Sequence, residues 1–304
     1  MCHSCSMPIT DKKEITNKPR WLKVPLPKGG NFSKLQSELK SRGLATVCQE
    51  AKCPNIGECW SAQTATVMIL GDTCTRACKF CHVKTGNPAG FIDQNEIKHT
   101  VEMVSMMALR YIVITSVDRD DLDDGGAEHF ANIIKAVHEN HPTTKVEVLI
   151  PDFDSKPNSM KKIGEANPFV IAQNIETVKR LTHPVRDRRA GYEQTLNALK
   201  FYKENYPHIA TKSSIMVGLG ETLEEIKQTC LDLRNVGVNI VTFGQYLQPS
   251  LRHLKVDRYY KPDEFEDLKK MAYELGFDFV ASGAMVRSSY KAADYFDWLE
   301  ARGN

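Results

Sequence analysis

The strongest constraint on the fold of this chain is a regular alternation of short β-branched runs with amphipathic segments, which begins near residue 66. Seven runs rich in Val, Ile, Thr and Phe have the length of strands: 66–70, 111–115, 146–150, 169–172, 213–217, 239–243 and 277–281. Between them, apolar residues recur at helical spacing, as at Phe130, Ile133, Ile134 and Val137. Strands that alternate with helices form βαβ units and a parallel sheet. The sequence therefore predicts an α/β fold, and six or seven units in about 215 residues suit a barrel, or most of one.

The charge and the hydropathy of the chain exclude some classes of partner. The net charge of +2, with 26% charged residues, is close to balance. Proteins dedicated to nucleic acid or to membrane surfaces usually carry a large basic excess. No apolar run approaches the roughly 20 residues that span a bilayer, and residues 1–21 lack the apolar segment of a secretory signal. We expect a cytoplasmic protein without a nucleic-acid or membrane partner.

The cysteines are numerous and concentrated. Six of the nine lie between residues 48 and 81, where they form two groups of three: Cys48, Cys53 and Cys59, then Cys74, Cys78 and Cys81. In a reducing compartment such cysteines point to metal binding or catalysis rather than to disulfides. Tetrahedral metal sites usually take four ligands. Each group therefore lacks one ligand.

The second group, in "CTRACKFC", fits an iron–sulfur cluster. Its spacing lets one loop hold three irons of a four-iron cube with thiolates, the usual ligands, and leaves the fourth iron open. The alternative is a zinc ion with His82 or a distant residue as the fourth ligand. Because His82 directly follows Cys81, the two side chains are poorly placed to chelate the same ion. The iron–sulfur interpretation is favoured.

This cysteine group also follows the first predicted strand. Active sites of parallel barrels lie at the carboxyl ends of the strands. Polar residues follow three further strands of the prediction, namely Ser116, Asp152 and Asn174. The sequence therefore predicts an active site at this end of the barrel.

The C-x3-C-x2-C spacing after the first strand of a barrel resembles the radical SAM (S-adenosylmethionine) superfamily, and Phe80 matches its aromatic position. The resemblance implies a partial TIM-like (β/α)6 barrel with N-terminal and C-terminal extensions. It also implies that the amino and carboxylate groups of S-adenosylmethionine complete the cluster held by Cys74, Cys78 and Cys81. An electron from that cluster would then cleave the sulfonium and give a 5′-deoxyadenosyl radical.

Further motifs narrow the resemblance to the lipoyl synthase family. The first cysteine group stands in "CQEAKCPNIGECW", and five motifs follow in the family's order: "TSVDRDDLDDGGAEHF", "NIETV", "VGLGET", "QYLQPSLRHLKVDRY" and "RSSY". The resemblance covers about residues 20–295. It implies three parts: 1–65 with the auxiliary cysteines, 66–282 as the barrel, and 283–304 with "RSSY".

The "RSSY" motif implies the ligand that the first cysteine group lacks. By resemblance, the oxygen of Ser289, with Ser288 as the alternative, binds an auxiliary 4Fe–4S cluster together with Cys48, Cys53 and Cys59. A serine oxygen is a hard ligand among soft thiolates, which suits a cluster that must open during turnover. Without the cysteines, "RSSY" would be interpreted as an exposed polar turn.

The resemblance also implies contacts to S-adenosylmethionine at the ends of several strands. We expect the methionyl, ribose and adenosine parts to contact Ser116, Asp118, Asn174, Glu176, Arg186, Gly218 and Gly220. Each also has a simpler interpretation as a loop residue or a helix cap, and Asn174 is a plausible N-cap. The glycines of "VGLGE" are not a dinucleotide fingerprint, because the third glycine is absent.

The implied activity is that of a sulfurtransferase of lipoate biosynthesis. The family inserts sulfur at C6 and C8 of an octanoyl group on a carrier-protein lysine, using two S-adenosylmethionine molecules and the auxiliary cluster as sulfur donor. The implied partners are octanoylated carrier domains, namely the glycine cleavage H protein and the acyltransferase subunits of 2-oxoacid dehydrogenases. A flavodoxin or ferredoxin as low-potential electron donor and an iron–sulfur carrier for cluster repair are implied too, and we expect a monomer.

Three other classes remain open at this stage. One is another sulfur-inserting radical SAM enzyme similar to biotin synthase, although the auxiliary spacing and "RSSY" argue against it. Another is a non-catalytic two-cluster electron carrier, but two-cluster ferredoxins carry four cysteines per cluster in a shorter chain. The third is a structural zinc protein. Cys230, on the apolar face of a predicted helix, is expected in the core.

Overall fold

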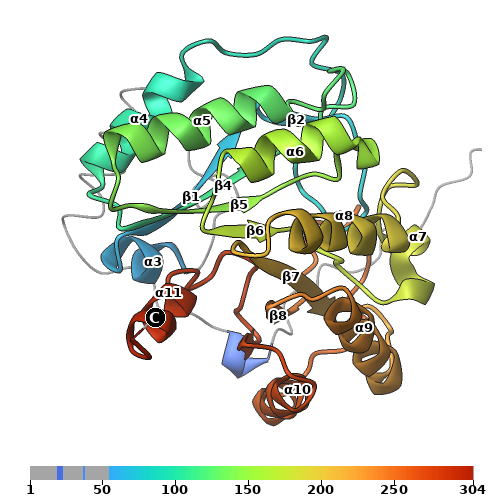
Figure 1. Cartoon of the computed structure of the whole chain (residues 1–304). Helices are drawn as coiled ribbons and strands as arrows, with labels where there is room; N and C mark the ends of the chain where they lie inside the picture. Colours follow the sequence, from blue (N-terminus) through green and yellow to red (C-terminus); the bar gives the residue numbers. More distant parts are fainter. Residues whose placement is uncertain (1–18, 23–36, 38–54, 304) are drawn as a thin grey trace, which may run out of the picture.

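The computed structural model describes residues 19–22, 37 and 55–303 of the chain, and Figure 1 draws the remainder as a grey trace. Its centre is a parallel sheet whose seven strands follow chain order: β1 (Thr64–Ile69), β4 (Tyr111–Ser116), β5 (Lys145–Leu149), β6 (Val170–Ala172), β7 (Ala210–Val217), β8 (Ile240–Gln245) and β9 (Phe279–Gly283). Within the described residues β1 and β9 form the two edges. All seven predicted strands are confirmed, and the sheet is an open barrel.

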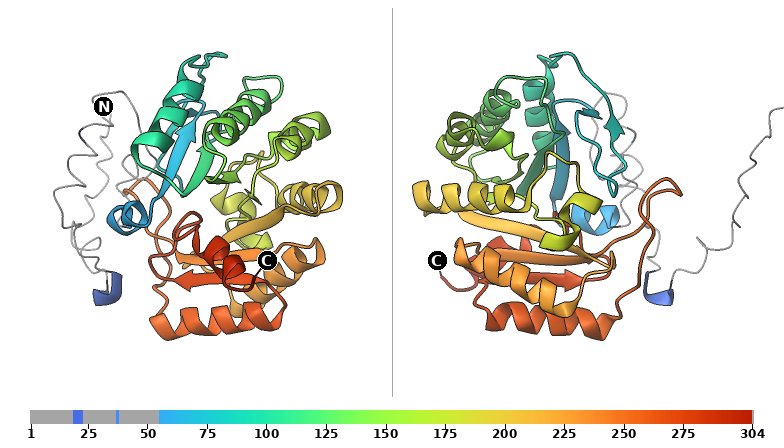
Figure 2. Two further views of the ribbon diagram at one scale, coloured as in Figure 1. Left: turned by 60° about the vertical axis from the view of Figure 1, so that its left-hand side comes forward. Right: turned by 90° about the vertical axis from the view of Figure 1, so that its right-hand side faces the viewer.

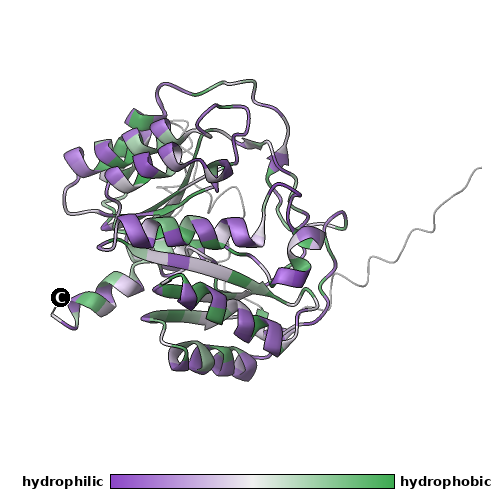
Figure 3. Cartoon of the chain, turned by 45° about the vertical axis from the view of Figure 1, so that its right-hand side comes forward, coloured by the Kyte–Doolittle hydropathy of each residue, from purple (hydrophilic) through white to green (hydrophobic). Residues whose placement is uncertain are grey.

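Six helices follow the first six strands of this sheet and cover its outer side (Figures 1 and 2). They are α4 (Glu96–Met106), α5 (Ala127–Asn140), α6 (Pro157–Glu165), α8 (Tyr192–Asn205), α9 (Leu223–Asn235) and α10 (Pro262–Glu274). The predicted (β/α)6 arrangement is confirmed, with β9 as an additional strand. Figure 3 shows the amphipathic character of these helices, because hydrophobic and hydrophilic residues alternate along each of them.

Shorter elements flank this framework. They are the helices α3 (Ile56–Ser61), α7 (Thr182–Val185) and α11 (Asp294–Glu300), the 3-10 turns η2 (Arg20–Leu22), η3 (Phe153–Ser155) and η4 (Lys179–Leu181), and the paired strands β2 (Thr73–Cys74) and β3 (Lys84–Thr85). Among the described residues there is no helix long and apolar enough to cross a membrane.

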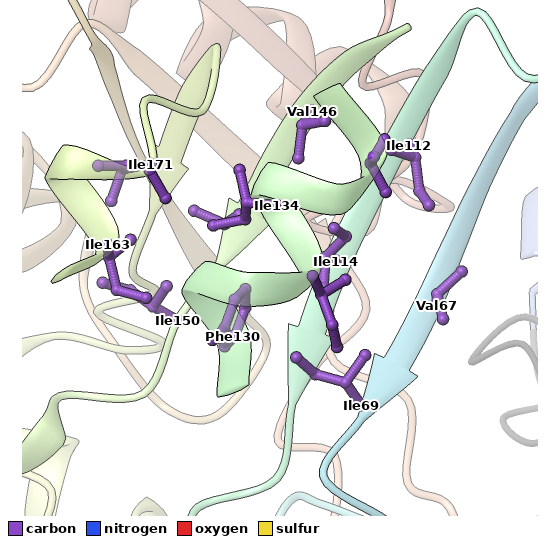
Figure 4. Close-up of a cluster of buried hydrophobic side chains, with 14 of the residues drawn as sticks. Val67, Ile69, Ile112, Ile114, Phe130, Ile134, Val146, Ile150, Ile163 and Ile171 are labelled. Carbon is purple, nitrogen blue, oxygen red and sulfur yellow. The ribbon is translucent and has the colours of Figure 1, made fainter. Parts of the chain in front are cut away.

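The largest apolar core lies between the sheet and its helices (Figure 4). Successive strand residues point to opposite faces, so Ile112 and Ile114 of β4 join this core, where Phe130 and Ile134 of α5 meet them. Gly126 starts α5 in a left-handed conformation, with φ of 85°. A side chain there would collide with Leu70 of the same core. The outward alternate residues of the strands therefore hold the helices in place.

The inward alternate residues fill one half of the barrel with a buried polar group. Lys212 donates a hydrogen bond of 2.7 Å to one oxygen of Glu147, and the Tyr111 hydroxyl donates one of 2.8 Å to the other. Burial of an ion pair requires such complete hydrogen bonding. Thr115, which lies further along β4 on the same inward face as Tyr111, lines an open cavity instead. The free space in the barrel therefore lies toward the carboxyl ends of the strands.

Helix α11 covers the opposite end. Tyr295 of α11 packs against Phe169 and Phe279, which stand at the starts of two strands. Asp297 accepts two hydrogen bonds from Arg110, at 2.5 and 2.8 Å. In Figure 2 this helix lies against the sheet, away from the outer helices. In the part of the chain that the structure describes, the barrel thus opens at the carboxyl ends of the strands.

Candidate active site

The open end of the barrel holds a cavity of about 290 Å³, which is small for a site that accepts a drug-sized ligand. Its walls come from the ends of β1, β4 and β5, the loops after β6, the cysteine loop that follows β1, and the C-terminal segment. Five predicted metal ligands line it: Cys74, Cys78, Cys81, Ser288 and Ser289. The cysteine loop and "RSSY" therefore face a common chamber.

Burial of the cysteine loop disfavours the charged thiolate form of its three cysteines. Burial raises the pKa of Cys74 to about 11 and that of Cys78 to about 12, and burial also raises the pKa of Cys81. Cys74 Sγ donates to Asp118 at 3.8 Å. Thiols bind metals as thiolates, so metal binding here must release protons. Three buried thiols on one loop beside a cavity fit the predicted iron–sulfur cluster.

Arg76, between the first two cysteines, anchors this loop to the barrel. The residue is 5% exposed. Its guanidinium donates two hydrogen bonds to Asp152, at 2.5 and 2.8 Å, and three to Asp120, at 2.9 to 3.3 Å. Asp118 lies 3.4 Å away. Bidentate arginine–carboxylate pairs fix orientation as well as position. The loop is therefore fastened to the chain that follows β4 and β5.

A second attachment comes from the chain after α7. Asp187 accepts a hydrogen bond of 2.8 Å from the Ala77 amide, and its own amide donates to Cys78 Sγ at 3.2 Å. Arg189 connects the two attachments, because it contacts both Asp187 and Asp120. An N–H donor to the Cys78 sulfur would stabilise its thiolate. Neither Arg76 nor Asp187 was predicted from the sequence, where the available signal was a cation between the first two cysteines of the motif and an acidic stretch after residue 117.

Five of the predicted S-adenosylmethionine contacts lie in the cavity wall, together with Phe80: Ser116, Asp118, Asn174, Glu176 and Arg186. Gln173, which the sequence analysis missed, lies there too. Three polar atoms among them are buried and have no hydrogen-bond partner in the described part of the chain, namely Ser116 Oγ, Gln173 Oε1 and Asn174 Oδ1. An unsatisfied buried polar atom costs about 1–3 kcal/mol. Three such atoms in one wall indicate a polar ligand.

The charged residues of this wall are also perturbed. Burial raises the pKa of Asp118 to about 6, and Arg76 opposes the shift. Burial raises the pKa of Glu176 too, against the effect of Arg186. Glu176 has a left-handed backbone, with φ of 67°, which a non-glycine residue adopts at a cost. Perturbed carboxyls and strain in a cleft are typical of functional sites.

Gly218 and Gly220 lie outside the residues that line the cavity. Both have φ of +99°, and a side chain at Gly218 would stand 2.2 Å from Gln245 Nε2 and 2.5 Å from the Arg258 carbonyl oxygen. The close contact of Gly218 with the end of β8 and the loop after it therefore explains the need for glycine at this position. Their contact with adenosine stays a prediction.

The C-terminal "RSSY" segment meets the helix that carries Cys59. Asn55 donates to the Met285 carbonyl at 2.7 Å across 230 residues of sequence. Glu58 accepts from the Tyr290 hydroxyl at 2.8 Å and pairs with Lys291 at 2.9 Å. Cys48 and Cys53 lie outside the described residues. One predicted cysteine ligand is thus joined to the segment that carries both candidate serines.

A glycine in β8 makes room for this segment. A side chain at Gly244 would stand 2.3 Å from the Val286 carbonyl oxygen, and one at Gly283 of β9 would touch the Val286 side chain at 3.4 Å. The segment therefore leaves β9, crosses the inner face of β8 and reaches α3, which directly precedes β1. It lies across the side on which the sheet is open.

Comparison with known families agrees with this fold and site. The family model of the radical SAM superfamily matches residues 68–233, which include the cysteine loop and most of the strands. The open parallel barrel and its C-x3-C-x2-C loop therefore make the chain a member of the radical SAM superfamily. A second model, the N-terminal domain of lipoyl synthase, matches residues 7–53.

Curated relatives extend over nearly the whole chain. The lipoyl synthase of Francisella tularensis subsp. novicida is 54% identical over 297 residues, which cover 97% of this chain and 91% of the relative. The lipoyl synthase of Ectopseudomonas mendocina is 53% identical over 280 residues, covering 92% and 80%. The chain belongs to the lipoyl synthase family, and it is an enzyme.

Solved structures share the fold at low identity. Methylornithine synthase (PylB) has a TM-score of 0.53 at 14% identity and covers 89% of this chain and 92% of its own. HydG, a hydrogenase maturase, has a TM-score of 0.56 at 13% identity, covering 87% and 74%. At these identities the similarity concerns the fold alone.

Proposed function

We propose that the protein inserts two sulfur atoms into an octanoyl group held on a lysine of a carrier protein, at C6 and C8, and so makes the lipoyl cofactor. The observation that carries this proposal is the shared cavity, lined both by the radical-type cysteine loop and by Ser288 and Ser289. A radical enzyme that adds sulfur needs its radical and its sulfur source on the same substrate chain. A biotin synthase-like enzyme or an electron carrier has no use for the serine segment.

The cysteine loop would hold the first cluster. Cys74, Cys78 and Cys81 would bind three irons, and the bound cluster with S-adenosylmethionine would supply a strongly oxidising primary carbon radical. The chain's own part is to orient this ligand. Asn174 and Ser116 line the cavity and have buried oxygens without a hydrogen-bond partner in the described part of the chain, and Arg186 would offer a positive charge to the carboxylate of the ligand.

The remaining wall of the cavity suits an alkyl chain. Apolar residues line it between the cysteine loop and the strand ends, namely Met68, Val83, Val117 and Leu149. The C–H bonds at C6 and C8 are unactivated, so no side-chain base deprotonates them near neutral pH. An apolar wall would place these carbons and keep competing hydrogen donors away from the radical.

The auxiliary cluster would be held by Cys48, Cys53, Cys59 and Ser289, with Ser288 as the alternative. A bound cluster there would supply sulfide, and its loss would require repair by an iron–sulfur carrier. The contacts of α3 with Met285, Tyr290 and Lys291 support this assignment. We also infer the three-part division at 1–65, 66–282 and 283–304.

The remaining partners are proposals on the same basis. We propose octanoylated H protein and acyltransferase subunits of 2-oxoacid dehydrogenases as substrates, and a flavodoxin or ferredoxin as reductant. We further propose that the enzyme acts as a monomer in the cytoplasm.

Single-turnover mass spectrometry of a short octanoyl-lysine peptide tests the function. With both clusters loaded and a chemical reductant, we expect two sulfurs gained and two 5′-deoxyadenosines released for each octanoyl group consumed. Deoxyadenosine release with sulfur gain at an unrelated substrate would favour a biotin synthase-like reaction. Reversible reduction without any cleavage of S-adenosylmethionine would favour the electron carrier, and zinc without iron the structural alternative.

Glu58 offers a graded test of the serine segment. Replacing Glu58 by alanine removes its contacts to Tyr290 and Lys291, of which the ion pair is largely exposed. Such contacts contribute about 1–2 kcal/mol together. We expect sulfur insertion to fall about fivefold while release of 5′-deoxyadenosine changes less than twofold. The measurements are the ratio of the two products and the Mössbauer spectrum of the auxiliary cluster.

Glu193, whose exposed ion pair with Lys179 lies on another part of the surface, provides the matched control. The Glu193→Ala variant should keep the native product ratio. A Glu58→Ala variant with a native ratio and a native spectrum would show that the contact between α3 and the segment is unimportant for the serine ligand.

A further inference from the structure

The cysteine loop separates two hollows. Besides the inner cavity, an open groove of about 640 Å³ lies on the outer side of the loop. Four residues line both hollows: Cys78, Cys81, Val83 and Thr85. A single layer of chain therefore stands between the outer groove and the predicted site of the radical cluster.

The outer groove is positively charged. The ionisable residues that line it, apart from the cysteines, are Lys79, His82, Arg252 and His253, and no Asp or Glu is among its described lining residues. Lys79, His82 and Arg252 are exposed. The rest of the chain is close to charge balance, so this is a local concentration of positive charge.

The far side of the groove is held against the cysteine loop. His253 makes a hydrogen bond of 3.0 Å to the Cys81 carbonyl and one of 2.8 Å to Ser250. The Leu254 amide donates to the Lys79 carbonyl at 3.3 Å. These bonds join the loop after β8 to the cysteine loop. The groove is therefore already formed without a partner, which lowers the entropic cost of docking.

We propose that this groove is the docking site of a small acidic protein that carries a low-potential electron. The inference rests on the proposed function, which requires one electron for each S-adenosylmethionine cleaved. The reduced carrier would be oxidised by one electron, which would pass through the cysteine loop. The electron would reach the sulfonium and break one carbon–sulfur bond, to leave methionine and the 5′-deoxyadenosyl radical.

Distance and charge together favour this occupant. Electron transfer slows steeply with distance, and the inner cavity is needed for S-adenosylmethionine and substrate, so the carrier must approach from outside. The outer groove is where only one layer of chain intervenes. A positive groove attracts a negatively charged carrier, raises the rate of encounter and allows quick release. Electron-transfer complexes typically bury little surface and bind weakly, and a groove of about 640 Å³ is compatible with such a small interface.

Charge reversal in the groove tests the proposal. We would compare the native enzyme, loaded with both clusters, with the variants Lys79→Glu, Arg252→Glu and the double variant, using release of 5′-deoxyadenosine with a short octanoyl-lysine peptide. Each enzyme is assayed separately with two reductants. One is a purified acidic flavodoxin with its reductase, at a flavodoxin concentration below saturation and at low salt, and the other is sodium dithionite. Lys135→Glu, an exposed position on the outer side of α5, is the matched control.

With flavodoxin, we expect the double variant to lose about tenfold in rate, since electrostatic steering contributes about 10- to 1,000-fold to association. With dithionite, the rate should stay within twofold of native, and the Lys135→Glu variant should be native with both reductants. The loss should shrink as salt rises, because salt screens the attraction.

Native flavodoxin-driven rates in the double variant would overturn the proposal. If the double variant also fails with dithionite, its cysteine loop is damaged. The Arg252→Glu variant, whose substitution lies outside that loop, then decides the question: a lower rate with flavodoxin and a native rate with dithionite support the proposal, and native rates with both reductants overturn it. If the variants, assayed with dithionite, are slow with the whole octanoylated carrier protein but not with the short peptide, the groove would be assigned to binding of the carrier protein instead. Release of 5′-deoxyadenosine does not require sulfur insertion, so the result stands even if the proposed product is absent.

Discussion

In a Cys59→Ala variant, sulfur insertion is expected to fall by more than about a hundredfold, since even partners of metal ligands contribute about 10- to 100-fold, while S-adenosylmethionine is still cleaved to 5′-deoxyadenosine. Cys59 is buried in α3, beside the contacts that bring in the "RSSY" segment. Without this thiolate the auxiliary cluster would lose one of its three soft ligands. The radical cluster should survive, because its loop is anchored through Arg76 to other strands. The measurement is product analysis after a single turnover.

The iron content gives a second readout for this variant. Two 4Fe–4S clusters correspond to about eight irons per chain, and the variant should hold about four. Cys230 is the matched control, since it is fully buried in α9 and far from either predicted site in the sequence. A Cys230→Ala variant should keep its iron and its product. If Cys59→Ala kept eight irons and native insertion, α3 would have no part in the sulfur site.

An Arg76→Met variant is expected to lose the radical cluster and about 3–5 kcal/mol of stability. Methionine has a similar length, but it leaves Asp152, which is 3% exposed, without its bidentate partner. A buried carboxylate without a cation is costly, and the cysteine loop would lose its attachment to the chain after β4 and β5. We expect no release of 5′-deoxyadenosine. Chemical denaturation and the cluster's visible absorption measure the two effects.

Two controls separate the anchor from simple loss of charge. Arg76→Lys keeps the charge but cannot bind two carboxylates in a planar fork, so it should recover only part of the stability and of the cluster. Arg180→Met removes an exposed ion pair with Glu225 and should leave the stability close to native, because exposed pairs contribute little. An Arg76→Met enzyme with native stability and native cleavage would show that the loop needs no anchor.

The strands and the cysteine loop could be predicted because their signals are local. A β-branched run such as 111–115 disfavours helix and favours strand through its own side chains. Three cysteines within eight residues must share one loop in any fold. Ser116 and Asn174 were found in the same way, since each follows a strand and parallel strands end at a common edge. Their side-chain oxygens have no hydrogen-bond partner in the described part of the chain, and their contact with S-adenosylmethionine stays a prediction.

The anchoring residues could not be predicted, because their partners lie far away in the sequence. Arg76 and Asp152 are separated by 76 residues, and Glu58 and Tyr290 by 232. Nothing local distinguishes Arg76 from a solvated arginine, or Glu58 from an ordinary surface carboxylate. Gly244 likewise resembles any strand glycine until Val286 crosses above it.

The parallel α/β architecture, the two groups of three cysteines and the family of the chain could all be inferred from the amino-acid sequence. Each of these depends on spacing along the chain, which folding does not change. That the cysteine loop and "RSSY" line one cavity, and that the same loop carries a basic groove on its outer side, became visible only in the folded protein. Those relations depend on how the barrel brings distant segments together, and packing of the whole chain sets that arrangement.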